Sequence, residues 1–254
     1  ILLQKDLDQL QKWEAIWKME FHPQKCQILR VTNKIKLIKS KYCIHNIPLQ
    51  DTNAAKYLGI LIESKLKCKE QYNAVIKKAN GVLAFLRRNI NDCPANVKSE
   101  CFKTLVRPIL EYGSAVWDPY HQIDIFNLEK VQKRAARFAT GNYISESGNT
   151  KINMHKLNWK PLEERRAAIK LNLLFKATKN MIHIPMNHMS YNQHSTRRKD
   201  VNFAIPASAV DSHLYSFYPN TIRLWNDLPA GCKHLSSADS FKKHIDKITL
   251  RSAY

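Results

Sequence analysis

Residues 124–141, "DIFNLEKVQKRAARFATG", predict the fold of the central part of the chain. Their apolar positions recur every three or four residues, which is the period of an amphipathic α-helix. We expect a helix over residues 123–139 that Gly141 ends, because glycine adopts the left-handed backbone after a helix without strain. The predicted apolar face consists of Ile125, Leu128, Val131, Ala135 and Phe138.

The other face of this predicted helix is basic. Its cations lie at i, i+3, i+4 and i+7, and they are Lys130, Lys133, Arg134 and Arg137. Four like charges on one face repel one another in an isolated helix. An anionic partner such as a phosphate backbone would offset that repulsion, so the pattern favours phosphate contact. A basic face that contacts only water is the alternative.

Two more helices precede this one. An apolar stripe of helical period runs from residue 68 to residue 90, and a second helix is expected from residue 95 to about 116. The turn "NDCPANVKSE" separates them, with Pro94 near the first helical turn. Three helices on short connections predict a compact bundle over 66–142. We expect its core to include Leu86, Leu105, Leu128, Val131 and Phe138.

The second of these helices contains an internal proline, in "LVRPILEYGSAVWDPY" at 105–120. Pro108 should kink the helix, because proline lacks the N–H of the helical ladder. Arg107 lies at the predicted bend and is a candidate nucleic-acid contact. We expect Tyr112, Trp117 and Tyr120 to hold the turn into the third helix. Core packing at the kink explains these aromatic residues equally well.

The N-terminal part predicts a different arrangement. Residues 2–20 form an amphipathic pattern that His22-Pro23 ends. Segments 25–32, 41–49 and 55–62 are rich in β-branched and aromatic residues, and we expect them to form one small antiparallel sheet against the first helix. Asn46 and Pro48 mark the turn between the last two segments.

The C-terminal part is predicted to be helical with one long loop. A helix over 161–180 starts at a proline, and its "EERR" sequence favours pairing within the helix. A polar stretch at 181–216 predicts a loop, and two short helices follow at 216–229 and 237–248. The predicted fold class is therefore α+β, mostly α. The expected divisions are 1–65, 66–142 and 143–254.

Composition narrows the choice of partner. The chain has 41 Lys and Arg against 21 Asp and Glu, a net charge of +20. The cations are spread along the whole chain, which disfavours a disordered basic tail and favours a polyanionic partner such as nucleic acid. The six cysteines form no C-x-x-C pair, and no apolar run approaches the ~18 residues of a membrane span. We expect no membrane contact and an intracellular location, in the nucleus or cytoplasm, without secretion.

Several chemistries have no motif in this sequence. There is no G-x-x-x-x-G-K-[ST] loop, G-x-G-x-x-G fingerprint or G-x-S-x-G elbow. Two-metal phosphoryl chemistry needs clustered carboxylates, and the only acidic doublet is Glu163-Glu164. Ten histidines occur without the spacing of a metal site. We expect no cofactor, no metal and no catalytic centre in this chain.

The order of several segments resembles a known family. "LQKDLDQLQKWEAIWKMEFHPQKCQILRVT", "KYLGILI", "KKANGVLAFLRRN", "LVRPILEYGSAVWDPY", "LEKVQKRAARFATG" and "SFYPNTIRLWNDLP" follow one another here. The series resembles the C-terminal part of reverse transcriptases of non-LTR (LINE-type, Jockey- or CR1-like) retrotransposons. It covers nearly the whole chain, from Leu2 to about Phe241.

The resemblance implies roles for particular segments. Residues 1–65 would be the end of the polymerase palm, and 66–142 the thumb that binds the template–primer duplex. The F/Y-A-D-D strand, whose aspartates hold Mg²⁺ in the intact polymerase, would lie upstream and is absent here. "HPQKC" resembles the family's N-x-x-K-[TC] motif, with His22 in place of the usual Asn. Lys25 would then lie near the incoming pyrophosphate, although a surface lysine before a strand is an equal reading.

The resemblance also implies nucleic-acid contacts. "KYLGI" would be the strand that grips the primer end, where Gly59 lets two backbones approach closely. Burial of Tyr57 and Leu58 in a strand is the structural alternative. Implied or candidate contacts are Tyr57, Leu58, Gly59, Arg87, Arg88, Arg107, Lys130, Lys133, Arg134 and Arg137.

Two alternative functions stay open. The chain begins at Ile1 and its first methionine is Met19, so we expect a fragment of a longer protein. The resemblance implies partners in an RNA–DNA hybrid or other nucleic acid and in the rest of the parent polyprotein. The fragment could instead be a stand-alone, non-catalytic nucleic-acid-binding module from a decayed element. A helical scaffold with an incidental basic surface is the third reading.

Overall fold

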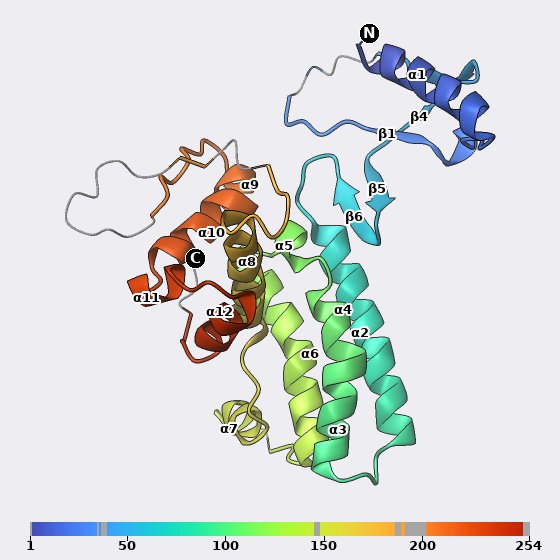
Figure 1. The fold of residues 1–254 in the computed structure, drawn as a ribbon. Helices are drawn as coiled ribbons and strands as arrows, with labels where there is room; N and C mark the ends of the chain where they lie inside the picture. The colour runs from blue at the N-terminus through green and yellow to red at the C-terminus, as the bar shows by residue number, and fades with distance from the viewer. Residues whose placement is uncertain are drawn as a thin grey trace. The chain divides into compact units, whose positions relative to one another are not determined.

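The computed structural model describes residues 2–34, 36, 40–144, 148–185, 189–190 and 202–250. The chain forms two compact units, Ile1–Gln71 and Tyr72–Tyr254, which we call the N-terminal and C-terminal units. Figure 1 labels most of their helices and strands. The chain is mostly helical, with a few short strands, which confirms the predicted α+β class.

The strands of the N-terminal unit do not form the single antiparallel sheet that the sequence predicted. The described strands make three two-stranded sheets. β1 (Gln27–Leu29) pairs in parallel with β4 (Gln50–Thr52). β2 (Cys43–Ile44) and β3 (Ile47–Pro48) form one hairpin, and β5 (Ala54–Tyr57) and β6 (Ile60–Glu63) form another.

Tight turns explain this difference. His45 and Asn46 have φ of 51° and 60°, and Leu58 and Gly59 have φ of 46° and 83°. Two consecutive residues of positive φ make the turn whose twist matches a two-residue hairpin. Two segments expected to be single strands, 41–49 and 55–62, therefore each fold back on themselves. The turn lies at His45-Asn46 instead of between the segments.

The first helix, α1 (Leu2–Trp17), contacts β2 through its polar face. The N–H of Cys43 donates to Gln4 Oε1 at 2.9 Å, and the N–H of His45 donates to Gln11 Oε1 at 3.2 Å. Buried Glu14 pairs with His45 at 3.0 Å. The apolar face of α1 is left exposed at Leu3, Leu10, Trp13 and Trp17.

The C-terminal unit contains the predicted three-helix bundle. Its members are α2 (Lys69–Asn89), an α3–α4 helix and α6 (Gln122–Thr140), which run side by side in Figure 1. Buried side chains from all three fill the core, and Leu86, Leu128, Val131 and Phe138 are among them as predicted. Leu105 was wrongly predicted to be buried, since it is 50% exposed.

The second helix widens just before its proline. α3 (Ala95–Cys101) passes into a π-helical turn, Phe102–Val106, before α4 (Arg107–Glu111). Pro108 has no N–H to donate to the fourth residue before it, and the N–H of Arg107 donates to the carbonyl of Phe102, five residues back. The extra residue in this turn rotates the positions around it, which accounts for the exposure of Leu105.

The helix ends earlier than the sequence predicted. Gly113 takes a left-handed conformation, with φ of 63°, and the short α5 (Ser114–Trp117) follows. Trp117 is buried and donates its indole N–H to the carbonyl of Tyr112 at 2.9 Å. Tyr120 stacks on Tyr215 with centroids 4.5 Å apart. Trp117 thus holds the turn as expected, whereas the ring of Tyr112 is exposed and that of Tyr120 packs against Tyr215.

Helices after the bundle pack around α8 (Leu162–Thr178), which matches the predicted 161–180 helix. α10 (Phe217–Asn226) and α12 (Ala238–Ile245) contact α8 and share an apolar core with it. Three short helices were not predicted: α7 (Asn149–Lys156), α9 (Asp211–Leu214) and α11 (Ala230–Lys233). Much of the predicted loop at 181–216 lies outside the described residues.

Candidate nucleic-acid interface

The structure places the predicted basic face on the outside of the bundle. Residues opposite the cations are buried, as the helical period requires. Gly141 follows α6 with φ of 66°, so the helix ends where the sequence predicted. Of the four cations, Arg134 is exposed and Lys130, Lys133 and Arg137 are half-buried.

The hydrogen bonds recorded for these cations go to neutral groups. Lys130 Nζ donates to Asn127 Oδ1 at 3.4 Å, and Arg134 Nη1 donates to Asn80 Oδ1 of α2 at 3.0 Å. Among the ion pairs of the described residues, none includes a cation of this face. Lys133 acts on Glu129 at longer range, but burial dominates and raises the pKa of that carboxyl. Most of the positive charge of this face is therefore not neutralised locally.

Other predicted contact residues also lie at the surface. Arg87 and Arg88 are exposed in the last turn of α2, where a cation also interacts favourably with the helix dipole. Lys25 is exposed at the end of a 3₁₀ turn, Pro23–Lys25, one residue before β1 begins at Gln27. Its position matches the surface-lysine reading. A contact with pyrophosphate stays a prediction.

The structure places Tyr57, Leu58 and Gly59 at the end of β5 and in the hairpin turn that follows, and their contact with nucleic acid stays a prediction. Tyr57 is the last residue of β5, and Leu58 and Gly59 form the turn. The side chains of Tyr57 and Leu58 are both exposed, so the alternative of burial in a strand is wrong. Gly59 is needed for its positive φ, because an L side chain would be strained there. The sequence signal for the turn was a glycine between two short apolar runs.

Arg107 was expected to lie at the surface as a nucleic-acid contact, but the structure buries it. It is 9% exposed, and its guanidinium carbon lies 5.4 Å from the ring centroids of both Phe102 and Trp159. Burial, and then the nearby Arg165, lower the pKa of Arg107 to about 10. Burial against two rings makes Arg107 a weaker candidate for contact with a phosphate backbone than the exposed Arg134, and that contact stays a prediction.

A buried ionic network around Asp118 was not predicted from the sequence. Arg166 Nε and Lys170 Nζ of α8 lie 2.6 Å and 2.5 Å from the carboxylate of Asp118, and Lys170 also donates to Asn220 of α10 at 2.8 Å. Burial alone would raise the pKa of Asp118, but Lys170 and Arg166 outweigh it and lower that pKa. The cations of "EERR" thus pair across helices, since Arg165 also bonds Glu111 of α4, and the predicted pairing within the helix is wrong for both arginines.

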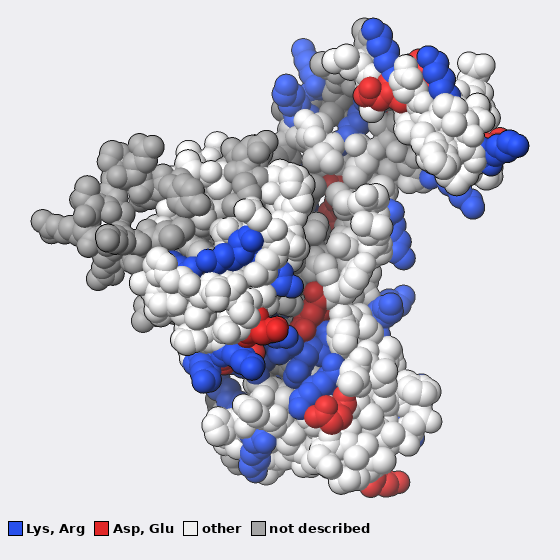
Figure 2. Space-filling model, in the orientation of Figure 1, with Lys and Arg blue, Asp and Glu red and all other residues white. Residues whose placement is uncertain are grey.

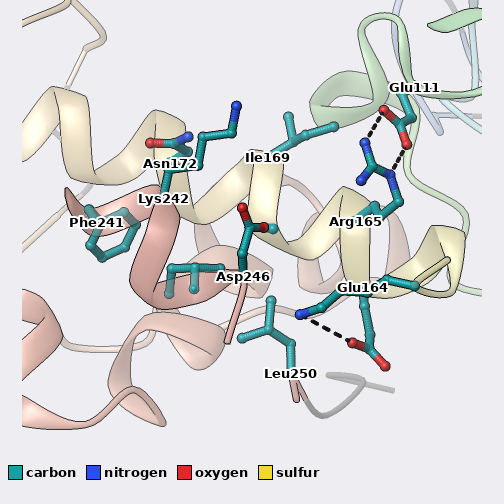
Figure 3. Close-up of a pocket in the computed structure, with 12 residues that line it drawn as sticks. Glu111, Glu164, Arg165, Ile169, Asn172, Phe241, Lys242, Asp246 and Leu250 are labelled. Atoms are coloured by element: carbon teal, nitrogen blue, oxygen red, sulfur yellow. Dashed lines mark hydrogen bonds and ion pairs between the residues drawn. The ribbon is translucent and has the colours of Figure 1, made fainter. Parts of the chain in front are cut away.

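A pocket of about 460 Å³ lies between α8 and α12 (Figure 3). Two of its three cations are matched with anions, Arg165 with Glu111 and Lys160 with Glu164 at 3.9 Å. The third, Lys242, is in none of the ion pairs found among the described residues. Figure 2 likewise shows acidic side chains lying beside basic ones in this region. The pocket therefore offers less free positive charge than the α6 face.

The part of the chain that the structure describes has no group of side chains suited to binding a metal ion. No three His, Cys, Asp or Glu side chains gather there as metal ligands. All six cysteines are free thiols. None of the described helices combines the length and apolarity needed to cross a bilayer.

Comparison with known proteins gives one curated relative. The chain is 23% identical over 133 residues to a probable RNA-directed DNA polymerase from transposon X-element of Drosophila melanogaster. The match covers 51% of this chain and 14% of that protein. No protein-family model matches the chain, and no solved structure matches it significantly. The chain is thus related, distantly and in part, to a transposon RNA-directed DNA polymerase.

Proposed function

We propose that this chain is the C-terminal part of a non-LTR retrotransposon reverse transcriptase and that it binds the template–primer duplex. The N-terminal unit would be the end of the palm, and the bundle would be the thumb. The observation that carries this proposal is the α6 face, whose four cations are in none of the ion pairs found among the described residues. The relation to a transposon RNA-directed DNA polymerase supports it.

Binding of this kind acts through the backbone. Each cation placed against a phosphate releases condensed counterions, so affinity falls with salt and depends little on base sequence. The rest of the parent polyprotein would supply the catalytic strand and its Mg²⁺. The described residues of this chain do not fit such a metal site, because no cluster of three donors occurs among them. We assign no catalytic step to this chain.

The test is the salt dependence of binding to an RNA–DNA hybrid. Lys130, Lys133, Arg134 and Arg137 are all replaced by Gln, which is a comparable helix former. The slope of log affinity against log salt should become shallower by about two to four units. A matched control replaces four exposed cations of α7 and α12 by Gln, namely Lys151, Lys156, Lys242 and Lys243. It should change the slope by less than about one unit.

Two results would count against the proposal. An unchanged slope in the α6 variant would show that the face contacts only water. Equal losses in both variants would indicate diffuse attraction to the whole basic surface, which is the scaffold reading. Primer extension by the purified chain with primed RNA, deoxynucleotides and Mg²⁺ would refute the assignment of catalysis to the rest of the polyprotein.

A further inference from the structure

An aromatic residue lies at the N-terminal end of the basic face, one helical turn before Lys130. Phe126 is 47% exposed on α6. At about 100° per residue, it lies within about 40° of Lys130, Lys133 and Arg137 around the helix axis. The buried Leu128 and Ala135 lie on the opposite side. The ring of Phe126 therefore cannot join the core of the bundle.

Two lysines of this face are held against the ring. The Nζ of Lys130 lies 4.6 Å, and that of Lys133 5.0 Å, from the ring centroid of Phe126. Cations attracted to an aromatic ring at such distances stay beside it. The face thus presents one accessible aromatic ring and two ammonium groups within a single cluster, which we call the Phe126 cluster.

This combination matches the chemistry of unpaired nucleotides. Proteins that bind single strands place aromatic rings for base stacking beside cations that contact the phosphates. In a fully paired duplex each base is already stacked on its neighbours, so a protein ring finds a free base face only where pairing has ended. Phosphate contact alone would need no aromatic residue on this face.

We propose that Phe126 stacks on an unpaired base, so that the α6 face binds a hybrid duplex at its junction with a single strand. This inference rests on the proposed function and names its ligand more closely. The cations would follow the phosphates on both sides of the junction. Phe126 would distinguish the unpaired strand from the duplex.

The experiment compares three ligands in direct binding measurements: a blunt RNA–DNA hybrid, the same hybrid with an unpaired template extension, and the extension strand alone. Phe126→Leu keeps an apolar side chain of good helix propensity but removes the aromatic face. It should weaken binding to the two ligands with unpaired bases by roughly 5- to 150-fold and change binding to the blunt hybrid by less than about twofold. Phe126→Trp should retain binding to all three.

A matched control is Phe85→Leu on α2. Phe85 is the same residue type and is also about half exposed. Its replacement should leave binding to every ligand unchanged. Phe126 lies outside the core, so Phe126→Leu should keep the helical circular dichroism of the parent chain.

The outcomes separate this inference from the proposed function. If Phe126→Leu weakens all three ligands equally, or none of them, the stacking role is refuted and the ring is an apolar surface that lysine stems cover. The four-Gln variant reports on the phosphate contacts independently. If its salt slope on the blunt hybrid is unchanged, the proposed function fails, whatever Phe126→Leu does.

Discussion

Helices α1 and α6 carry the same kind of amphipathic pattern but have opposite environments. The apolar residues of α6 are buried in the bundle core, whereas those of α1 are exposed and its polar residues contact a hairpin. Among the described residues of the N-terminal unit, Ile44 is the only buried apolar side chain. The C-terminal unit has a bundle core and a second apolar core around α8. An amphipathic period therefore identifies a helix and its faces but not what covers the apolar face.

The largest expected effect comes from a comparison of two ion-pair sites, one buried in the C-terminal unit and one half-exposed in the N-terminal unit. Asp118→Asn leaves Arg166 and Lys170 buried without an anion, and should lower the unfolding free energy of the C-terminal unit by about 3–5 kcal/mol. Asp51→Asn removes the half-exposed partner of Arg30, 3.0 Å away in the N-terminal unit. It should cost about 0–1 kcal/mol. Hydrogen exchange measured segment by segment gives each unit its own value, and similar losses would contradict the contrast.

Asp118 also predicts a pH dependence. Its pKa is lowered in the folded chain from the ordinary value of 3.8. The unfolded chain therefore takes up the proton first as pH falls, so the contribution of Asp118 is full above that value and is lost below it. Asp118→Asn should flatten the decline of stability below about pH 4. The same decline in parent and variant would assign it to other carboxylates.

A second prediction compares two leucines within the bundle. Leu128→Ala empties a fully buried site and should cost about 2–5 kcal/mol. Leu105 is half-exposed within the π-helical turn, so Leu105→Ala should change stability by less than about 0.5 kcal/mol. Denaturant melts measure both. Equal losses would show that Leu105 belongs to the core and that the π-helical turn does not rotate its side chain outward.

The smallest effect concerns the hairpin tip of the N-terminal unit. Leu58→Asn places Asn-Gly, which favours positive φ, in the turn and should stabilise the hairpin by a few tenths to about 1 kcal/mol. Gly59→Ala forces a side chain onto φ of 83° and should destabilise it by about 1 kcal/mol. Exchange of the β5 and β6 amides measures both. If both variants destabilise the hairpin, its turn is not of this type.

The sequence predicted most of the helices and the exposed basic face. α2, α6 and α8 have long periods and end at clear signals such as Gly141. The cations of α6 were found because their spacing is local. The short helices α7, α9 and α11 were missed, because four to eight residues hold too few turns for a period to show.

Tertiary structure alone decided which polar groups meet. Asp118 lies 48 residues from Arg166 and 52 from Lys170, and nothing local marks them as partners. Arg107 and Arg134 are both arginines of bundle helices. Arg107 is packed against the rings of Phe102 and the distant Trp159, whereas Arg134 lies exposed on α6 beside Asn80 of α2. Spacing along a helix fixes which face a cation occupies, because the backbone geometry is local. Whether that face is buried, paired or open depends on segments distant in sequence, and only the packed chain brings them together.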